Sequence, residues 1–331
     1  MFPIFAGSVR KATGENMSRL SFSAIARELN LSTAVVSNVL RNTSTTTLAS
    51  NTTKQKILTA IWEKGLRLSN NIGVIVSREI REHEALFYPG FAGITERCAR
   101  LGLSTTLLES TEESEISATL RLNNFCGVIF WNEASPKLLK VVAGEKIPFV
   151  FLNPQQKYAE ADSILFDDYD LMYRLLLYLH EKSYRRYIFL AGRNSFYIEE
   201  QRRGFHAFLK EKKATGILLD NFNDNQTILK DEVTNSNRET VFITFFRYET
   251  IKILELFFSC SKSFPEDGGL VASNLLADFY VPQLTTIMNP YYESGSKAVD
   301  MIAEKWNTRN LNHGTHVVMK GKIIKNQSTG E

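Results

Sequence analysis

The residues best suited to chemistry lie on one predicted helix near the N-terminus, over about Thr33–Leu40. The solvent side of this segment offers short or polar groups, namely Thr33, Ala34, Ser37, Asn38 and Arg41. Groups of this kind at helical spacing can reach base edges and phosphates in the major groove of DNA. The alternative interpretation is a plain three-helix bundle with a polar face.

Three short helices must hold these side chains in place. The apolar spacing predicts them over about Ser23–Leu29, Thr33–Leu40 and Asn51–Lys64. Ser32 and Ser50 are positioned as N-caps of the second and third helices. Asn30 can adopt the left-handed conformation that a tight link requires. Small Ala26 lets the first two helices cross closely and Val36 fills the space between them, so the pair has a helix-turn-helix arrangement.

Charge is distributed unevenly along the chain. Residues 1–70 contain nine Lys and Arg and three acidic residues, a net charge of +6, and the rest of the chain carries −3. A basic head on a mildly acidic body is typical of a phosphate-binding module joined to a separate sensing domain. A chance asymmetry would give the same counts.

Beyond the head, short apolar segments alternate with amphipathic helical patterns. We expect strands at 72–76, 104–108, 127–131, 148–152, 187–191, 240–246 and 269–273. Nearly continuous Val, Ile, Phe and Leu segments separated by helices indicate parallel sheets covered on both faces. Ligands of such sheets bind beyond the carboxyl ends of the strands.

Motifs for an enzyme are missing from the sequence. There is no GxxxxGK[ST], GxGxxG, GxSxG or HExxH pattern, and Cys98, Cys126 and Cys260 are too widely spaced for a metal site or a disulfide framework. Asp167, Asp168 and Asp170 form an acidic cluster, which we assign to backbone hydrogen bonds or a cleft rim. We therefore predict no enzymatic activity, cofactor or metal, and free thiols in a reducing cytoplasm.

No apolar run reaches the roughly 18 residues that a membrane span needs, so no membrane association is expected. Residues 1–16 are expected to be a disordered extension, with Met17 as an alternative start.

The head closely resembles that of the LacI/GalR family of bacterial regulators. The matching segments are LSFSAIARELNLSTAVVSNVLRN and SNTTKQKILTAIWEKGLRLSN. The resemblance implies a DNA-binding domain over residues 17–70. By this resemblance, Thr33, Ala34 and Asn38 read bases, while Ser32, Ser37, Arg41 and Lys54 contact phosphates. The hinge helix of the family is missing, because Asn70 and Asn71 run directly into the first strand.

The body carries the same resemblance in IPFVFLN, RRGFHAFLKE, FPEDGGLVASN and LTTIMNPYYESGSKAVDMIAEK. It implies two Rossmann-like lobes with parallel sheets, the periplasmic-binding-protein-like fold, over residues 72–331. We expect lobe 1 over about 72–166 and 286–312, and lobe 2 over about 167–285 and 313–331. Crossovers between the lobes are expected near 165–168, 283–287 and 312–320.

The predicted effector cleft departs from the charged sugar-binding set of the family. Its expected lining is Phe87, Trp131, Asn153, Phe196, Gln201, Phe246, Arg247 and Asn274, with Tyr88 and Tyr197 as further aromatic candidates. Each aromatic could instead belong to the core, which is the commoner role. Arg202 and Arg203 are not expected to point into the cleft. We therefore expect a ligand other than a plain hexose bound in the usual way. A carbohydrate or a derivative of one is a candidate, and the alternative is that no ligand binds.

Together these features predict a cytoplasmic, homodimeric regulator, a repressor, that binds a palindromic DNA operator and responds to a small molecule. The alternative is a solute-binding or sensory module whose head no longer reads DNA, which the missing hinge helix favours.

Overall fold

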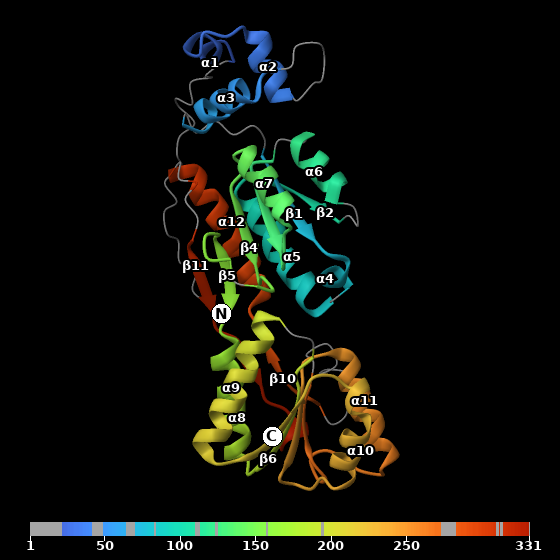
Figure 1. The fold of residues 1–331 in the computed structure, drawn as a ribbon. Coiled ribbons are helices and arrows are strands. Elements are labelled where there is room, and N and C mark those ends of the chain that lie inside the picture. The colour runs from blue at the N-terminus through green and yellow to red at the C-terminus, as the bar shows by residue number, and fades with distance from the viewer. Residues whose placement is uncertain are drawn as a thin grey trace. The chain divides into compact units, whose positions relative to one another are not determined.

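The computed structural model describes residues 22–41, 49–63, 70–82, 84–109, 113–122, 125–156, 158–192, 195–272, 283–308, 311 and 314–330. The chain divides into two compact units, residues 1–66 and 67–331. The first is helical, and the second consists of two α/β lobes (Figure 1).

The head contains the three predicted helices α1 (Phe22–Glu28), α2 (Thr33–Arg41) and α3 (Asn51–Glu63). The backbone N–H groups of Val35 and Thr53 donate to the hydroxyls of Ser32 (3.2 Å) and Ser50 (3.1 Å), so both predicted N-caps are present. Asn30 has a φ of 52°, the left-handed conformation expected for the link between α1 and α2. Ala26 and Val36 are buried where these helices pack, as predicted.

Lobe 1 is built on a six-stranded sheet in the order β11-β5-β4-β3-β1-β2, in which every pair of neighbours is parallel. Its strands are β1 (Asn71–Val76), β2 (Ser104–Leu108), β3 (Gly127–Trp131), β4 (Phe149–Leu152), β5 (Ser163–Phe166) and β11 (His316–Met319). Its helices are α4 (Arg78–Glu82), α5 (Glu84–Arg100), α6 (Glu113–Leu122), α7 (Pro136–Gly144) and α12 (Tyr291–Thr308).

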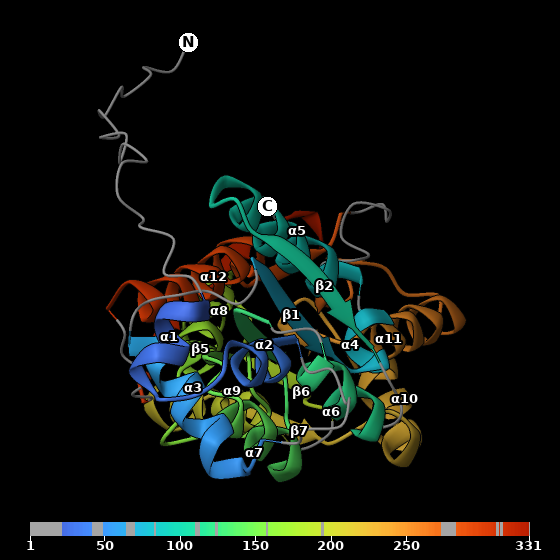
Figure 2. The ribbon, with the colours of Figure 1, turned by 90° about the horizontal axis from the view of Figure 1, so that it is seen from above.

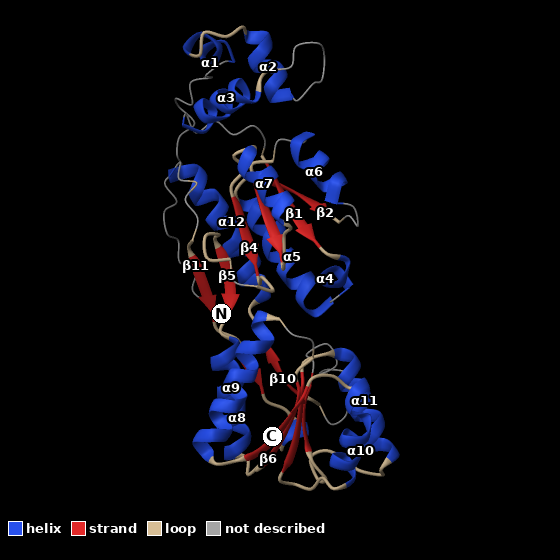
Figure 3. Ribbon diagram, viewed as in Figure 1, coloured by secondary structure: helices blue, strands red, loops and turns tan. Residues whose placement is uncertain are grey.

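Lobe 2 has a second six-stranded sheet, in the order β12-β10-β9-β8-β6-β7, with only β12 antiparallel. Its strands are β6 (Arg186–Leu190), β7 (Thr215–Leu219), β8 (Thr240–Thr244), β9 (Gly269–Ala272), β10 (Thr285–Met288) and β12 (Lys322–Ile324). Helices α8 (Asp168–Glu181) and α9 (Phe196–Lys212) cover one face, and α10 (Gln226–Thr234) and α11 (Arg247–Ser259) cover the other (Figure 3).

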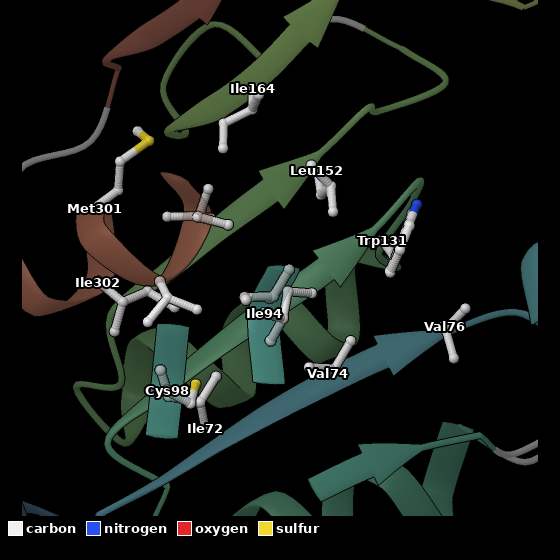
Figure 4. Packing of buried hydrophobic residues seen from close by; sticks show 14 of the residues in the cluster. Ile72, Val74, Val76, Ile94, Cys98, Trp131, Leu152, Ile164, Met301 and Ile302 are labelled. Carbon is white, nitrogen blue, oxygen red and sulfur yellow. The ribbon is translucent and has the colours of Figure 1, made fainter. Parts of the chain in front are cut away.

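Both faces of each sheet are covered, which explains why the strands read as continuous apolar runs. In β1, Val74 and Val76 pack toward α5 and α12, whereas Ile75 between them packs toward α6 and α7. Figure 4 shows the first of these clusters, where Ile94 of α5 and Ile302 of α12 meet the strand side chains. Helices α5 and α12 pack directly against each other (Figure 2).

The chain passes between the lobes three times, after β5, β10 and β11, so the predicted crossovers are close to those found. The lobe limits need two corrections. Strand β10 extends lobe 2 to Met288, and β11 belongs to lobe 1 because His316–Met319 pairs with Ser163–Phe166. The sequence of one strand does not show which of the two sheets it joins, because strands of both sheets have the same apolar pattern.

Each predicted strand is found to within two residues at either end. Five further strands were not among the predicted ones: β5, β10 and β11 lie at or beside the expected crossovers, and β7 and β12 had no counterpart in the prediction. The three cysteines are free thiols, with Cys98 and Cys126 buried. Among the helices that the structure describes, none has the length and apolar character needed to cross a membrane. The predicted extension over residues 1–16 lies outside the described residues.

Candidate functional site

The first candidate surface is the exposed side of α2 in the head. Ser32, Thr33 and Ala34 are exposed at its N-terminus, and Ser37 and Asn38 are half-buried one turn further on. Lys54 lies in the first turn of α3, where its side chain is half-buried. Arg41 is the last residue of α2. The predicted base-reading residues thus lie on consecutive turns of one helix, as major-groove readout requires. Their contacts with DNA stay predictions.

The second candidate is a cavity of about 180 Å³ between the two lobes. It is lined from lobe 1 by α4, α5 and the segments that follow β3 and β4, and from lobe 2 by α8, α9 and the carboxyl ends of β8, β9 and β10. The lining residues are Ile80, Leu86, Asn132, Asn153, Gln155, Asp168, Tyr197, Ile198, Gln201, Phe245, Phe246, Ala272, Ile287, Asn289 and Tyr291. This is the position that parallel sheets offer to ligands.

Two asparagines turn the chain at the edge of lobe 1. Asn132 follows β3 and Asn153 follows β4, with φ angles of 85° and 47°. Asparagine tolerates this left-handed region better than most residues. The Asn132 carbonyl accepts a hydrogen bond from the backbone N–H of Gln155 at 2.9 Å, which joins the two turns. The two carboxyl ends thus present amide side chains to the cavity.

The floor of the cavity in lobe 2 holds a buried carboxyl group. Asp168 is the first residue of α8 and is only 4% exposed, while its neighbour Asp167 caps the helix by accepting from the Asp170 N–H at 3.2 Å. The side-chain amide of Gln201 on α9 donates to Asp168 at 3.1 Å, and Asn289 forms a second hydrogen bond with it.

Burial raises the pKa of Asp168 to about 7, and the negative charges of Asp167 and Glu200 act in the same direction, whereas the two amide hydrogen bonds oppose the rise. Burial together with the charge of Asp168 also raises the pKa of Tyr291, at the start of α12. The Tyr291 ring packs edge-on against Phe166, with ring centroids 5.2 Å apart.

Within the part of the chain that the structure describes, three amide oxygens of residues that line the cavity are buried and have no hydrogen-bond partner. They are Oδ1 of Asn132, Oε1 of Gln201 and Oδ1 of Asn289. A buried acceptor without a partner costs about 1–3 kcal/mol. Such groups are expected where a ligand supplies the missing donors.

Several predicted cleft residues do line the cavity. Asn153, Gln201 and Phe246 are found there, together with the aromatic candidate Tyr197. Phe246 packs over Gly192, where a Cβ atom would lie 2.3 Å from its ring, so this position requires glycine.

Other predicted cleft residues lie elsewhere. Trp131 and Phe87 belong to the lobe 1 core, with ring centroids 5.6 Å apart, because the last residue of β3 points toward α5 and the cavity is met by the next residue, Asn132. Phe196 begins α9 but does not line the cavity. Arg247 and Tyr88 are exposed on the surface. Asn274 lies outside the described residues.

Two arginines of α9, Arg202 and Arg203, do not line the cavity, as expected, and both form ion pairs. Arg202 pairs with Glu199 (3.2 Å) and Asp220 (2.7 Å), and Arg203 pairs with Glu200 (2.5 Å). No lysine or arginine lines the cavity among the residues that the structure describes.

Asn132, Gln155, Asn289 and Tyr291 line the cavity although they were not predicted from the sequence, and so does Asp168, for which a cleft rim was one of two alternatives. Asp168 lies at one crossover between the lobes because it follows β5, and Asn289 and Tyr291 lie at another because they follow β10. In an interlobe cleft, a polar residue at a crossover is the signal that could have identified these three.

The lobes touch directly beside the cavity. The backbone N–H of Phe196 donates to the carbonyl of Gln155 at 2.8 Å, which joins the start of α9 to the segment after β4. This hydrogen bond would break if the lobes moved apart.

Within the described ranges, no group of three or more His, Cys, Asp or Glu residues is placed to hold a metal ion.

Comparisons with known proteins agree with this architecture. The family described as periplasmic binding proteins and sugar binding domain of LacI family matches residues 69–241, and a periplasmic binding protein-like domain family matches residues 176–329. No match was found among curated proteins.

Solved structures of similar fold include a complex of the transcriptional regulator CelR with cellobiose, with a TM-score of 0.67, 14% identity, and coverage of 93% of this chain and 99% of that one. The lac repressor dimer bound to operator and the anti-inducer ONPF has a TM-score of 0.64 and 18% identity, with coverage of 93% and 98%.

A LacI family transcriptional regulator from Enterococcus faecium with bound ribose has a TM-score of 0.65 and 18% identity, with coverage of 78% of this chain and 98% of that one. At these identities the likeness concerns the fold.

The expectation that the chain is not an enzyme agrees with a family of binding domains. Because the first family match spans more than half of the sequence, the chain belongs to the family of periplasmic binding proteins and sugar-binding domains of the LacI family.

Proposed function

We propose that this protein is a sequence-specific DNA-binding transcription regulator whose DNA affinity depends on a small molecule bound between its lobes. The observation that carries the proposal is the pairing of two parts in one chain. A head of three short helices, with the N-caps of α2 and α3 formed, precedes a two-lobed domain with a polar interlobe cavity. Two of the three solved regulators of similar fold named above carry cellobiose and ribose.

In this proposal the protein is a cytoplasmic homodimer and acts as a repressor. Two recognition helices α2, one from each subunit, enter successive major grooves of a palindromic operator. Thr33, Ala34 and Asn38 read bases, and Ser32, Ser37, Arg41 and Lys54 hold phosphates. The net charge of +6 in residues 1–70 supplies the attraction to DNA that does not depend on sequence.

The cavity supplies the second half of the proposed function. Its ligand would contact both lobes, so it would favour the arrangement in which Phe196 and Gln155 are hydrogen-bonded. A ligand that stabilises one arrangement of the lobes changes DNA affinity when the two arrangements hold the heads differently.

Selection of bound sequences from a random DNA pool tests the proposal, using the full-length chain at about 150 mM salt so that non-specific phosphate binding is suppressed. Enrichment of a palindrome supports a dimeric regulator. Recovery of unenriched sequences, with weak and strongly salt-dependent binding, would contradict it.

A second candidate function is a solute-binding or sensory module whose head has lost DNA readout. The observation that favours it is the short link between head and body, because only residues 64–70 separate the end of α3 from the start of β1. That segment is shorter than a typical helix with its flanking turns. Under this alternative the cavity would bind its ligand and the DNA selection would fail.

A further inference from the structure

The interlobe cavity has a chemical character that identifies a class of ligand. All three unpartnered buried side-chain atoms on its lining residues, those of Asn132, Gln201 and Asn289, are acceptors. A ligand that satisfies them must bring hydrogen-bond donors. Ligands dominated by acceptors, such as carboxylates and phosphates, would leave them unsatisfied.

The charges around the cavity also favour a ligand that donates hydrogen bonds, and specifically one with a positive charge. Asp168 has a nearly fully buried carboxyl group, and none of its described interactions is an ion pair. The other charged groups that influence it, Asp167 on α8 and Glu200 on α9, are also acidic. A buried carboxylate without a cationic partner is costly. A positive charge on the ligand would remove this cost.

Aromatic rings complete the described lining. Tyr197, Phe245 and Phe246 contribute rings, and Ile80, Leu86 and Ile287 contribute apolar surface. Aromatic faces attract cations and also pack on the C–H faces of sugar rings. The volume of about 180 Å³ is below the roughly 300–1,000 Å³ of pockets for drug-sized ligands, so the ligand is small.

From these observations we propose that the cavity binds a small hydroxylated cation of the amino-sugar class, with its ammonium group at Asp168 and its hydroxyl groups at the amide oxygens of Asn132 and Gln201. The ammonium donates to the carboxylate and each hydroxyl donates to one amide oxygen. This inference rests on the proposed function only in taking the interlobe cavity as the effector site.

The role of the two amides follows from the same geometry. Gln201 and Asn289 both form hydrogen bonds with Asp168, and their side-chain oxygens are without a partner. A carboxylate accepts hydrogen bonds only, so it draws the NH₂ end of each amide toward itself and turns the oxygen end away. Asp168 therefore binds the cation and also orients the Gln201 amide oxygen as an acceptor for a hydroxyl group, whereas the Asn289 oxygen turns toward Gly321.

Calorimetric titration of the full-length protein at pH 7 tests the proposal with three monosaccharide probes of similar size. D-glucosamine carries the ammonium group, D-glucose has a hydroxyl in its place, and D-glucuronate carries a negative charge. We expect glucosamine to bind at least about tenfold more tightly than glucose, and glucuronate to bind more weakly than glucose. Glucose binding as tightly as glucosamine, tighter binding of glucuronate, or no binding of glucosamine at millimolar concentration would overturn the proposal.

The variant Asp168→Asn tests whether Asp168 is the group that makes the protein prefer glucosamine to glucose. It keeps the shape of the side chain and removes the charge, so we expect the affinity for glucosamine to fall to that for glucose. The matched control is Asp231→Asn, an exposed aspartate on α10 that does not line the cavity, and it should keep the wild-type preference. A preference that survives in Asp168→Asn would overturn the assignment of the ammonium site.

This result is separable from the test of DNA binding. If the sugar titrations fail but the DNA selection enriches a palindrome, the protein is a DNA-binding regulator and the proposed ligand class is wrong. If the titrations succeed but no DNA sequence is enriched, the ligand class stands and the solute-binding alternative is favoured.

Discussion

The side-chain nitrogen of Gln201 lies 3.1 Å from a carboxylate oxygen of Asp168, and this contact joins α9 to the start of α8 at the cavity. Both side chains are buried. The amide oxygen of Gln201, Oε1, has no hydrogen-bond partner among the described residues. The unpaired oxygen lowers stability, and in our proposal a hydroxyl group of the ligand supplies the missing hydrogen bond.

The first prediction concerns the pH dependence of stability. Because the pKa of Asp168 is raised from 3.8 to about 7, the native state keeps this proton between those values while the unfolded state loses it. The contribution of Asp168 to stability therefore falls as the pH rises from about 4 to about 7, by about 4 kcal/mol at most. The acidic neighbours Asp167 and Glu200 and the phenol of Tyr291 surround this carboxyl.

Asp168→Asn removes this titration, so its free energy of unfolding should rise relative to wild type between pH 5 and pH 8. Urea unfolding at both pH values measures the difference. Asp231→Asn is the matched control for the loss of one carboxyl group at the surface, and the rise is expected in Asp168→Asn alone. An equal effect of Asp168→Asn at pH 5 and pH 8 would show that the carboxyl titrates normally.

The second prediction concerns the packing of α5 against α12. A Cβ atom on Gly93 would lie 2.0 Å from the carbonyl oxygen of Tyr292, and one on Gly295 would lie 2.1 Å from the carbonyl oxygen of Gly90. Both contacts are with backbone, so the helices would have to separate. Gly93→Ala and Gly295→Ala should each destabilise the protein by about 1–3 kcal/mol or more.

Gly144, at the end of α7, is the matched control, since a Cβ atom there meets nothing within 4 Å. Gly144→Ala should be neutral or stabilising by up to about 1 kcal/mol. Thermal or urea unfolding measures the stability of the three variants. If Gly93→Ala and Gly295→Ala are as stable as Gly144→Ala, α5 and α12 do not approach each other as closely as described.

How much of this could be read from the sequence differs between the fold and the cavity. The strands and helices followed from periodicity, because burial of both sheet faces leaves a strong apolar signal in segments such as Ile72–Val76. Caps at Ser32 and Ser50 and the left-handed Asn30 are local features, and they were predicted correctly.

The cavity depends on which way each side chain points at the end of a strand, and sequence says little about this. Trp131 and Asn132 are neighbours, yet one is in the core and the other lines the cavity. Asp168 and Tyr291 are more than 100 residues apart, and both reach the cavity because the chain crosses between the lobes beside them. The attachment of β11 to lobe 1 is likewise a tertiary property.

The third prediction concerns a buried ion pair in lobe 1. Lys305 of α12 pairs with Asp162, and both side chains are at least nine-tenths buried. The Asp162 carboxylate also accepts from the backbone N–H of Thr315 at 2.9 Å, which ties the segments before β5 and β11 together.

Lys305→Met should destabilise the protein by about 3–5 kcal/mol, because it removes the lysine charge from a buried ion pair. Adding Asp162→Asn to Lys305→Met should recover part of that loss. Denaturant titrations of the single and double variants provide the test. A single variant as stable as wild type would mean that the pair is solvated.

The fourth prediction separates base readout from phosphate contacts in the head. Asn38→Ala should cost about 1–3 kcal/mol on the selected DNA site and nearly nothing on random DNA. Lys54→Ala should weaken binding to both and reduce the slope of affinity against salt by about 1. Fluorescence anisotropy titrations measure these effects. Equal losses on selected and random DNA for Asn38→Ala would remove its assignment as a base-reading residue.

The most direct test of the central claim, that this chain is a DNA-reading regulator, is the ratio of its affinities for a selected palindrome and for a scrambled sequence of equal length, at about 150 mM salt. Specific regulators typically show ratios of about 10³–10⁷. We predict a ratio in this range for the full-length protein. A ratio near one, with the same salt dependence on both sequences, would contradict the claim and would leave a ligand-binding protein with a basic head.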